Sequence, residues 1–127
     1  MKADEILRSD GEFTLDLSTG QLVESGFAVS RTDGSLTIRA ESFFADRFCI
    51  HRYLRRERRC FSPGVVHLGA WLNAHRDIAV DPELSGRPTV VLLPTVVLPD
   101  RDDAVCLGAA LNQIAVYDLA SGVEILT

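Results

Sequence analysis

The chain has 127 residues, of which 46% are hydrophobic and 24% charged, and its formal net charge is -5. These values fit one globular domain with a real core. They argue against a general nucleic-acid-binding protein, because contact with phosphate needs broad positive potential. No apolar run approaches the roughly 20 residues of a membrane-spanning helix. The first residues, MKADEILRSD, lack the apolar core of a signal peptide. We therefore expect a cytoplasmic protein.

The N-terminal part of the chain predicts short strands. Residues 1–11 are polar and mixed, which indicates a loosely ordered start with one helical turn over 3–7. Phe13–Leu17 alternates apolar and polar residues, as a half-buried strand does. A broken strand is expected over 22–29. Asp33-Gly34 is the strongest two-residue hairpin signal in the chain, so a return strand is expected at 36–39.

The hydrophobic period changes after Ser42. From Phe44 to Leu54 the apolar side chains recur at steps of three and four, which predicts a helix over about 44–60. The other faces of this helix carry arginine, and positive charge near a helix C-terminus is favourable. Ser62-Pro63-Gly64 is expected to end the helix.

The C-terminal part of the chain predicts further strands and a second helix. The expected strands cover 65–72, 77–80, 89–98, 113–119 and 123–126. Pro94 places the third of these at a sheet edge, at a bulge, or in two short pieces. Asp100 has the residue type of an N-cap for a helix over about 101–112.

This order of elements predicts an α+β fold. A single domain over 1–127 would hold a mostly antiparallel sheet, with the helices 44–60 and 101–112 packed on one of its faces.

The residues that could carry chemistry give no catalytic or metal signature. Cys49, Cys60 and Cys106 are odd in number and lack CxxC or metal-ligand spacing, which is typical of reduced thiols. On a helix, Cys49 and His51 would point about 200° apart, so they cannot act together as nucleophile and base. The remaining metal-ligand types, namely His51, His67, His75, Asp77 and Asp81, show no ligand spacing. No nucleotide-binding fingerprint occurs. We expect no enzyme, no catalytic residue, no cofactor and no metal.

Three aromatic residues form a further candidate site. Trp71, with Tyr53 and Tyr117, is a candidate stacking platform for bases. The alternative is that these aromatics pack near strand ends.

Three stretches carry a resemblance. They are SGFAVS at 25–30, LGAWLN at 68–73 and ALNQIAVYDLASGVEILT at 110–127. Together with Thr19-Gly20, they resemble small uncharacterised proteins of bacteriophages and actinobacterial mobile elements. The resemblance spans most of the chain and implies a setting, a bacterial host cell, but no activity. The chain departs from the pattern in extra loop residues before Thr89 and in its arginine-rich first helix.

The most unusual feature is a basic segment in an acidic chain. Residues 46–60 hold six arginines and two acidic residues, a local net charge of +4, so the remainder carries -9. Arginine forks suit phosphate or carboxylate groups. The candidate partner-binding residues are Arg52, Arg55, Arg56 and Arg59, with Tyr53. Three interpretations stay open: ion pairs with the chain's own acidic residues, a protein partner (including a second copy in a homodimer), and nucleic acid.

The expected function is that of a small non-enzymatic phage or mobile-element accessory protein that binds another protein. An inhibitor of a host defence complex, of anti-CRISPR or anti-restriction type, fits the size and the setting. The alternatives are nucleic-acid or anion binding by the basic helix over 47–59, and a structural component of a virion.

Overall fold

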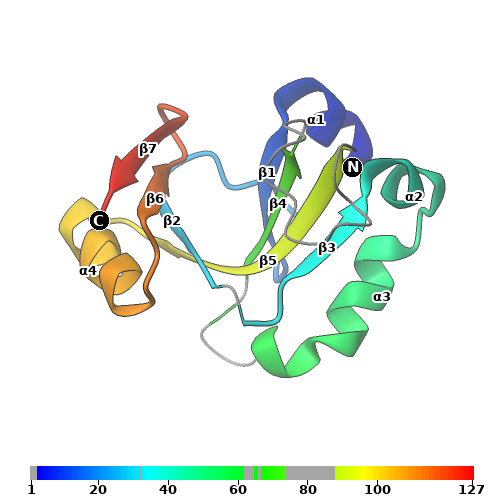
Figure 1. Cartoon of the computed structure of the whole chain (residues 1–127). Coiled ribbons are helices and arrows are strands. Elements are labelled where there is room, and N and C mark those ends of the chain that lie inside the picture. Colours follow the sequence, from blue (N-terminus) through cyan, green and yellow to red (C-terminus); the bar gives the residue numbers. More distant parts are fainter. Residues whose placement is uncertain (1–2, 32, 62–64, 66, 74–87) are drawn as a thin grey trace.

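A computed structural model describes residues 3–31, 33–61, 65, 67–73 and 88–127. It has the predicted α+β fold. Seven strands form one open sheet of order β1-β4-β5-β2-β6-β7, with β3 also paired to β5, and the pairs are antiparallel (Figure 1). In chain order the elements are α1 (Ala3–Asp10), β1 (Glu12–Asp16), β2 (Phe27–Ser30), β3 (Leu36–Arg39), α2 (Ala40–Ala45), α3 (Cys49–Arg56), the 3-10 helix η1 (Arg58–Phe61), β4 (His67–Asn73), β5 (Thr89–Leu98), α4 (Arg101–Ala110), β6 (Ala115–Asp118) and β7 (Val123–Leu126).

Strand β5 is the axis of the sheet. One side of it pairs with β4 over 89–95, and the other side pairs with β3 over 89–92 and with β2 over 95–98. The strands β2 and β3 therefore lie end to end along β5. The predicted hairpin at Asp33-Gly34 is wrong, because β2 and β3 run in the same direction and both pair with β5. Instead, the turn lies in a connection that leaves the sheet after β2 and returns to it at β3. We use the name excursion for the described residues of this connection, 31 and 33–35.

Pro94 lies where this excursion interrupts the ladder. Its carbonyl accepts a hydrogen bond from the Arg31 N–H (2.9 Å), on the side of β2 and β3. In an antiparallel strand the N–H and C=O of one residue point to the same side. The missing N–H of proline therefore also faces the excursion, where no ladder partner is needed. None of the three predicted places is found, because β5 is continuous over Thr89–Leu98, is paired on both sides, and keeps Pro94 in register with Leu68 of β4.

The predicted helix over 44–60 is in fact divided. Helix α2 ends at Ala45, and α3 begins at Cys49. Between them the Asp46 carboxylate accepts a hydrogen bond from the Phe48 N–H (3.0 Å), and the Asp46 carbonyl accepts one from Cys49 (3.1 Å). An aspartate that bonds the backbone two residues ahead competes with helix continuation. The turn allows Phe43 of α2 and Tyr53 of α3 both to be buried.

Apart from the strand at 22–23 and the elements outside the described residues, the other predicted elements are confirmed, several of them with shifted ends. The Asp100 carboxylate accepts a hydrogen bond from the Asp103 N–H (2.9 Å) and so caps α4. Strands β6 and β7 form the expected final hairpin. The strand expected at Leu22-Val23 is reduced to one bridge between Leu22 and Leu15. The strand at 77–80, its preceding turn over 74–76, the loop over 81–87 and the stop signal at 62–64 lie outside the described residues.

Two apolar cores lie on one face of the sheet. In the larger core, Leu68 and Leu92 of the sheet pack with Phe43 and Tyr53 from α2 and α3. In the smaller core, Val29 and Val116 of the sheet pack with Ala104 of α4; Leu107 and Leu111 are partly buried against this cluster. The antiparallel register puts these sheet residues on the same face. Both predicted helical regions therefore pack on one face, as expected, at opposite ends of β5 (Figure 1).

The N-terminal segment is more extensively structured than its sequence indicates. The expected single turn over 3–7 is a helix that continues to Asp10. Its Leu7 is fully buried and belongs to the larger core, and the Leu7 carbonyl accepts a hydrogen bond from the Gly11 N–H (3.0 Å).

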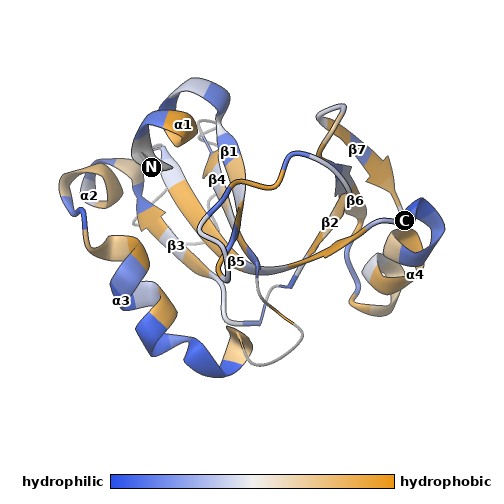
Figure 2. Cartoon of the chain, turned by 180° about the vertical axis from the view of Figure 1, so that it is seen from behind, coloured by the Kyte–Doolittle hydropathy of each residue, from blue (hydrophilic) through white to orange (hydrophobic). Residues whose placement is uncertain are grey.

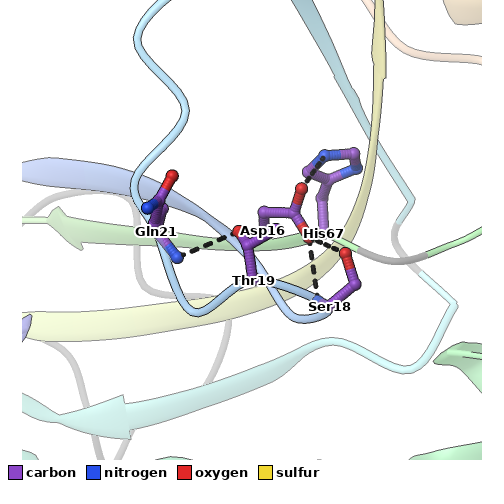
Figure 3. Close-up of polar contacts among 5 residues, drawn as sticks. All are labelled: Asp16, Ser18, Thr19, Gln21 and His67. Carbon is purple, nitrogen blue, oxygen red and sulfur yellow. Dashed lines mark hydrogen bonds and ion pairs between the residues drawn. The ribbon is translucent and has the colours of Figure 1, made fainter.

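The turn after β1 is held by a carboxylate. Asp16 accepts hydrogen bonds from the Ser18 hydroxyl (2.6 Å) and the Ser18 backbone N–H (2.8 Å), and lies 3.9 Å from His67 Nε2 (Figure 3). Thr19 Oγ1 accepts a further bond from the Gln21 N–H (3.2 Å). The hydrogen bonds from Ser18, the hydroxyl first, hold the pKa of Asp16 below its usual 3.8. The ionised form of Asp16 is therefore favoured by folding.

We expect the Asp16→Asn variant to lose part of the acid sensitivity of folding. Because the pKa of Asp16 is lower in the folded state than in the unfolded state, its contribution is complete above pH 3.8 and is lost as the pH falls through the folded value. Urea midpoints between about pH 5 and about pH 2.5 should fall less for the variant than for the parent protein. Asp33→Asn, on an exposed side chain, is the control. Equal acid sensitivity of Asp16→Asn and parent would contradict this account.

Candidate functional site

Helix α3 separates a buried side from a charged side. Cys49 and Tyr53 contribute to the larger core, while the arginines of α3 and η1 are exposed. The ribbon of α3 accordingly shows hydrophilic stretches next to hydrophobic ones (Figure 2). Arg55 and Arg56 lie in the last turn of α3, where cations interact favourably with the helix dipole. The helical sequence thus presents its positive charge to the outside of the molecule.

Two of the four candidate arginines have acidic partners in the chain. Arg52 forms an ion pair with Asp46, and Arg56 Nε lies 3.2 Å from Glu57 Oε1. Arg55 and Arg59 form no ion pair with any residue that the structure describes. Internal pairing therefore accounts for one half of the candidate set, and in that half the pairs are exposed and contribute about 0–1 kcal/mol each.

Tyr53 does not belong to an exposed surface. Its side chain is 2% exposed, and its hydroxyl donates a hydrogen bond to the Gly34 carbonyl (2.6 Å). Its ring meets the Phe61 ring edge to face. Burial raises the pKa of Tyr53 well above its usual value, so the hydroxyl stays a donor. The prediction that Tyr53 contacts a partner is therefore replaced by a structural role, which is to hold Gly34 of the excursion against α3.

An aromatic residue that the sequence placed in the buried stripe is exposed instead. The side chain of Phe48 is 53% exposed, and the Arg47 guanidinium lies 4.8 Å from its ring centroid. The Asp46 turn places Phe48 outside α3 and so removes it from the core. We use the name arginine surface for Arg47, Phe48, Arg52, Arg55, Arg56 and Arg59.

The thiols and histidines form no reactive group among the described residues. Cys49 is buried, and burial raises the pKa of its thiol above 9.0, which disfavours the nucleophilic thiolate. Cys60 is half-buried and Cys106 is exposed. Within the described ranges no three His, Cys, Asp or Glu side chains are grouped as metal ligands. His75, Asp77 and Asp81 lie outside those ranges.

The opposite face of the sheet carries a cleft. The register places Glu12 opposite Trp71, Thr14 opposite Gly69, and Tyr117 opposite Glu124, all on the face that the two cores leave uncovered. A cavity of about 440 Å³ lies there, with Asp10 of α1 and Glu24 of the β1–β2 connection also in its wall. We use the name acidic cleft for this cavity.

Two of the three candidate stacking residues line the acidic cleft. Trp71 is 43% exposed at its wall, and Tyr117 lines it from the other half of the sheet. Burial, followed by a hydrogen bond with the Glu12 carboxylate, raises the pKa of Tyr117 to about 12. The phenol is therefore protonated at neutral pH. Tyr53 lies on the other face of the sheet, so the three aromatics do not form one platform, and Tyr53 fits the alternative of a packed aromatic.

The charge of the acidic cleft is negative. Asp10, Glu12, Glu24 and Glu124 line it, and its described lining includes no lysine, arginine or histidine. Carboxylates repel phosphate, so the aromatics of this cleft are not suited to a nucleic acid. Sequence reasoning missed the site because these acidic residues come from three separate parts of the sequence, at 10–12, 24 and 124. The only signal was the alternation of polar side chains with apolar ones along β1.

Comparison with protein-family models, with curated proteins and with solved structures found no significant match. Among the described residues, no helix has the length and apolar character needed to cross a bilayer.

Proposed function

We propose that this protein is a small non-enzymatic accessory protein that acts by binding another protein through its arginine surface. The observation that carries the proposal is the pair Arg55 and Arg59, exposed and without a described ion-pair partner, on the same surface as exposed Phe48. Arginine and aromatic residues are enriched among the residues that dominate protein–protein binding.

The chemistry of the surface favours a protein partner that offers carboxylates. Arginine binds carboxylate in a fork-to-fork arrangement. A long nucleic acid would also meet the field of the rest of the molecule, which is strongly acidic outside residues 46–60. In the bacterial setting that the sequence resemblance implies, a host defence complex is the candidate partner, and the protein would act as its inhibitor.

The double variant Arg55→Gln/Arg59→Gln is expected to weaken partner binding about tenfold or more, since interface hot spots contribute at least about 2 kcal/mol. The measurement is capture from a lysate of defence-positive bacteria, followed by titration of the purified partner. Arg31→Gln/Arg101→Gln removes the same charge elsewhere and is the matched control. It should bind as the parent does, and both variants should unfold at the parent's urea midpoint.

Three results would overturn the proposal. The captured partner could bind the double variant as tightly as the parent protein. Duplex DNA could bind instead, with an affinity that falls steeply with salt and is lost in the double variant, which would favour the anion-binding alternative. Catalytic turnover of a captured partner would contradict a purely binding role.

A further inference from the structure

We propose that the acidic cleft binds an organic cation, an alkylammonium or guanidinium group. The cation is carried either by a free small molecule or by a lysine or arginine side chain of a peptide. The inference does not depend on the arginine surface, which lies on the other face of the sheet and selects the opposite charge.

The polar groups of the acidic cleft match a ligand that only donates hydrogen bonds. Its four carboxylates are acceptors and give the described lining a formal charge of -4. A guanidinium offers five N–H donors and an ammonium offers three, and neither accepts. Charge-assisted bonds of this kind are about twice as strong as neutral ones.

The aromatic groups of the acidic cleft match the same ligand. Trp71 presents a partly exposed indole, the best aromatic partner for a cation. Tyr117 presents a phenol that stays neutral up to a pKa of about 12. A neutral phenol keeps the electron-rich ring face that attracts cations and adds a hydroxyl oxygen.

The floor of the acidic cleft is lined by Thr14, which is 7% exposed. Its hydroxyl oxygen offers one more acceptor to a ligand that donates hydrogen bonds. Gly69, opposite Thr14 in the register, has no side chain that would fill the floor. A Cβ at Gly69 would also come within 2.5 Å of Thr95 Oγ1, so a larger residue does not fit there without a shift.

The size of the acidic cleft fits an organic cation rather than a bare ion. Its volume of about 440 Å³ lies within the range of about 300–1,000 Å³ found for small-molecule pockets. One guanidinium head fills a small part of that space, which leaves room for the alkyl chain or the peptide that carries it.

The sequence supplies its own reporter for this site. Trp71 is the only tryptophan in the chain, so its fluorescence reports on the cleft directly. We would titrate the full chain with agmatine, with a capped Gly-Arg-Gly peptide, and with the same peptide carrying citrulline, which keeps the shape but not the charge. Calorimetry of the same titrations covers the case in which the fluorescence does not change.

Agmatine, the arginine peptide, or both are expected to bind at least about tenfold more tightly than the citrulline peptide. Tighter binding of the peptide would identify a protein side chain as the source of the cation, and tighter binding of agmatine a free small molecule. Equal binding of arginine and citrulline peptides would overturn the proposal. So would the absence of heat and fluorescence change with both cations.

Variants of the acidic cleft localise the effect. Glu12→Gln/Glu124→Gln should weaken cation binding about three- to tenfold, in line with two partly exposed charge pairs. Glu24→Gln, on an exposed side chain outside the strands, should weaken it less and keeps the test valid if the double variant unfolds. Glu5→Gln, an exposed change on α1 outside the lining, is the control. The same affinity in all these variants would overturn the proposal, whereas Arg55→Gln/Arg59→Gln should leave it unchanged.

Discussion

Replacing Leu92 with alanine is expected to lower the free energy of unfolding by about 2–5 kcal/mol. Leu92 is 0% exposed and lies in the middle strand β5, opposite Ala70 of β4 and Leu36 of β3. Its side chain fills the larger core, where the strands on both sides and the helices above hold the neighbours in place. Such a site cannot collapse around the lost atoms, so the cavity adds to the lost transfer free energy.

Leu93 provides the matched control for Leu92. It is the same residue type on the same strand, but it points to the other face and lines the acidic cleft. Leu93→Ala is expected to cost about 1 kcal/mol, because the side chain is only partly removed from water. Urea unfolding of both variants measures the difference. Equal losses would contradict the assignment of the core to one face and the cleft to the other.

This pair also shows why the faces of β5 were not predictable. The strand reads TVVLLPTVVL and is apolar at nearly every position. Such a run predicts a buried strand but gives no period-2 signal to separate its two sides. The faces became clear only through the register with β1 and β4, where Phe13 and Leu15 alternate with Glu12 and Thr14.

The excursion between β2 and β3 marks a second limit of sequence reasoning. Asp33-Gly34 was correctly predicted to turn the chain, and Gly34 has a φ of +81°. Turn chemistry is local, however, and it does not specify which strand the returning segment pairs with. The pairing depends on β5, which is long enough to pair with both β2 and β3 along one side.

The arginine surface was predictable only where it depends on local sequence patterns. The segregation of arginine from the apolar stripe follows from helical periodicity, so the exposure of Arg55 and Arg59 was expected. The break at Asp46 depends on one side-chain hydrogen bond and was not expected, and with it the exposure of Phe48 was missed. The acidic cleft was not predictable, because its lining residues come together only when the two halves of the sheet pair.

The second large effect is expected at Gly34, where alanine should lower the free energy of unfolding by about 2–4 kcal/mol. A residue with a Cβ pays roughly 1–2 kcal/mol in the left-handed region. The new Cβ would also lie 2.5 Å from Cys60 Sγ and 3.0 Å from Cys60 Cβ. Rotation of the thiol relieves the first contact but not the second, so η1 or the excursion must move. That movement strains the hydrogen bond from the Tyr53 hydroxyl to the Gly34 carbonyl.

Gly11 separates the two causes, because it has the same φ of +81° and nothing within 4 Å of its ideal Cβ position. Gly11→Ala should therefore cost only the backbone term, about 1–2 kcal/mol. The stiffening of the unfolded chain by alanine is common to both variants and cancels in their difference. The excess loss in Gly34→Ala measures how tightly the excursion packs against η1 at Gly34 and Cys60. Because η1 carries Arg59, this variant should also weaken partner binding, while Gly11→Ala should not. Equal stabilities of the two variants would show that the excursion does not support the arginine surface.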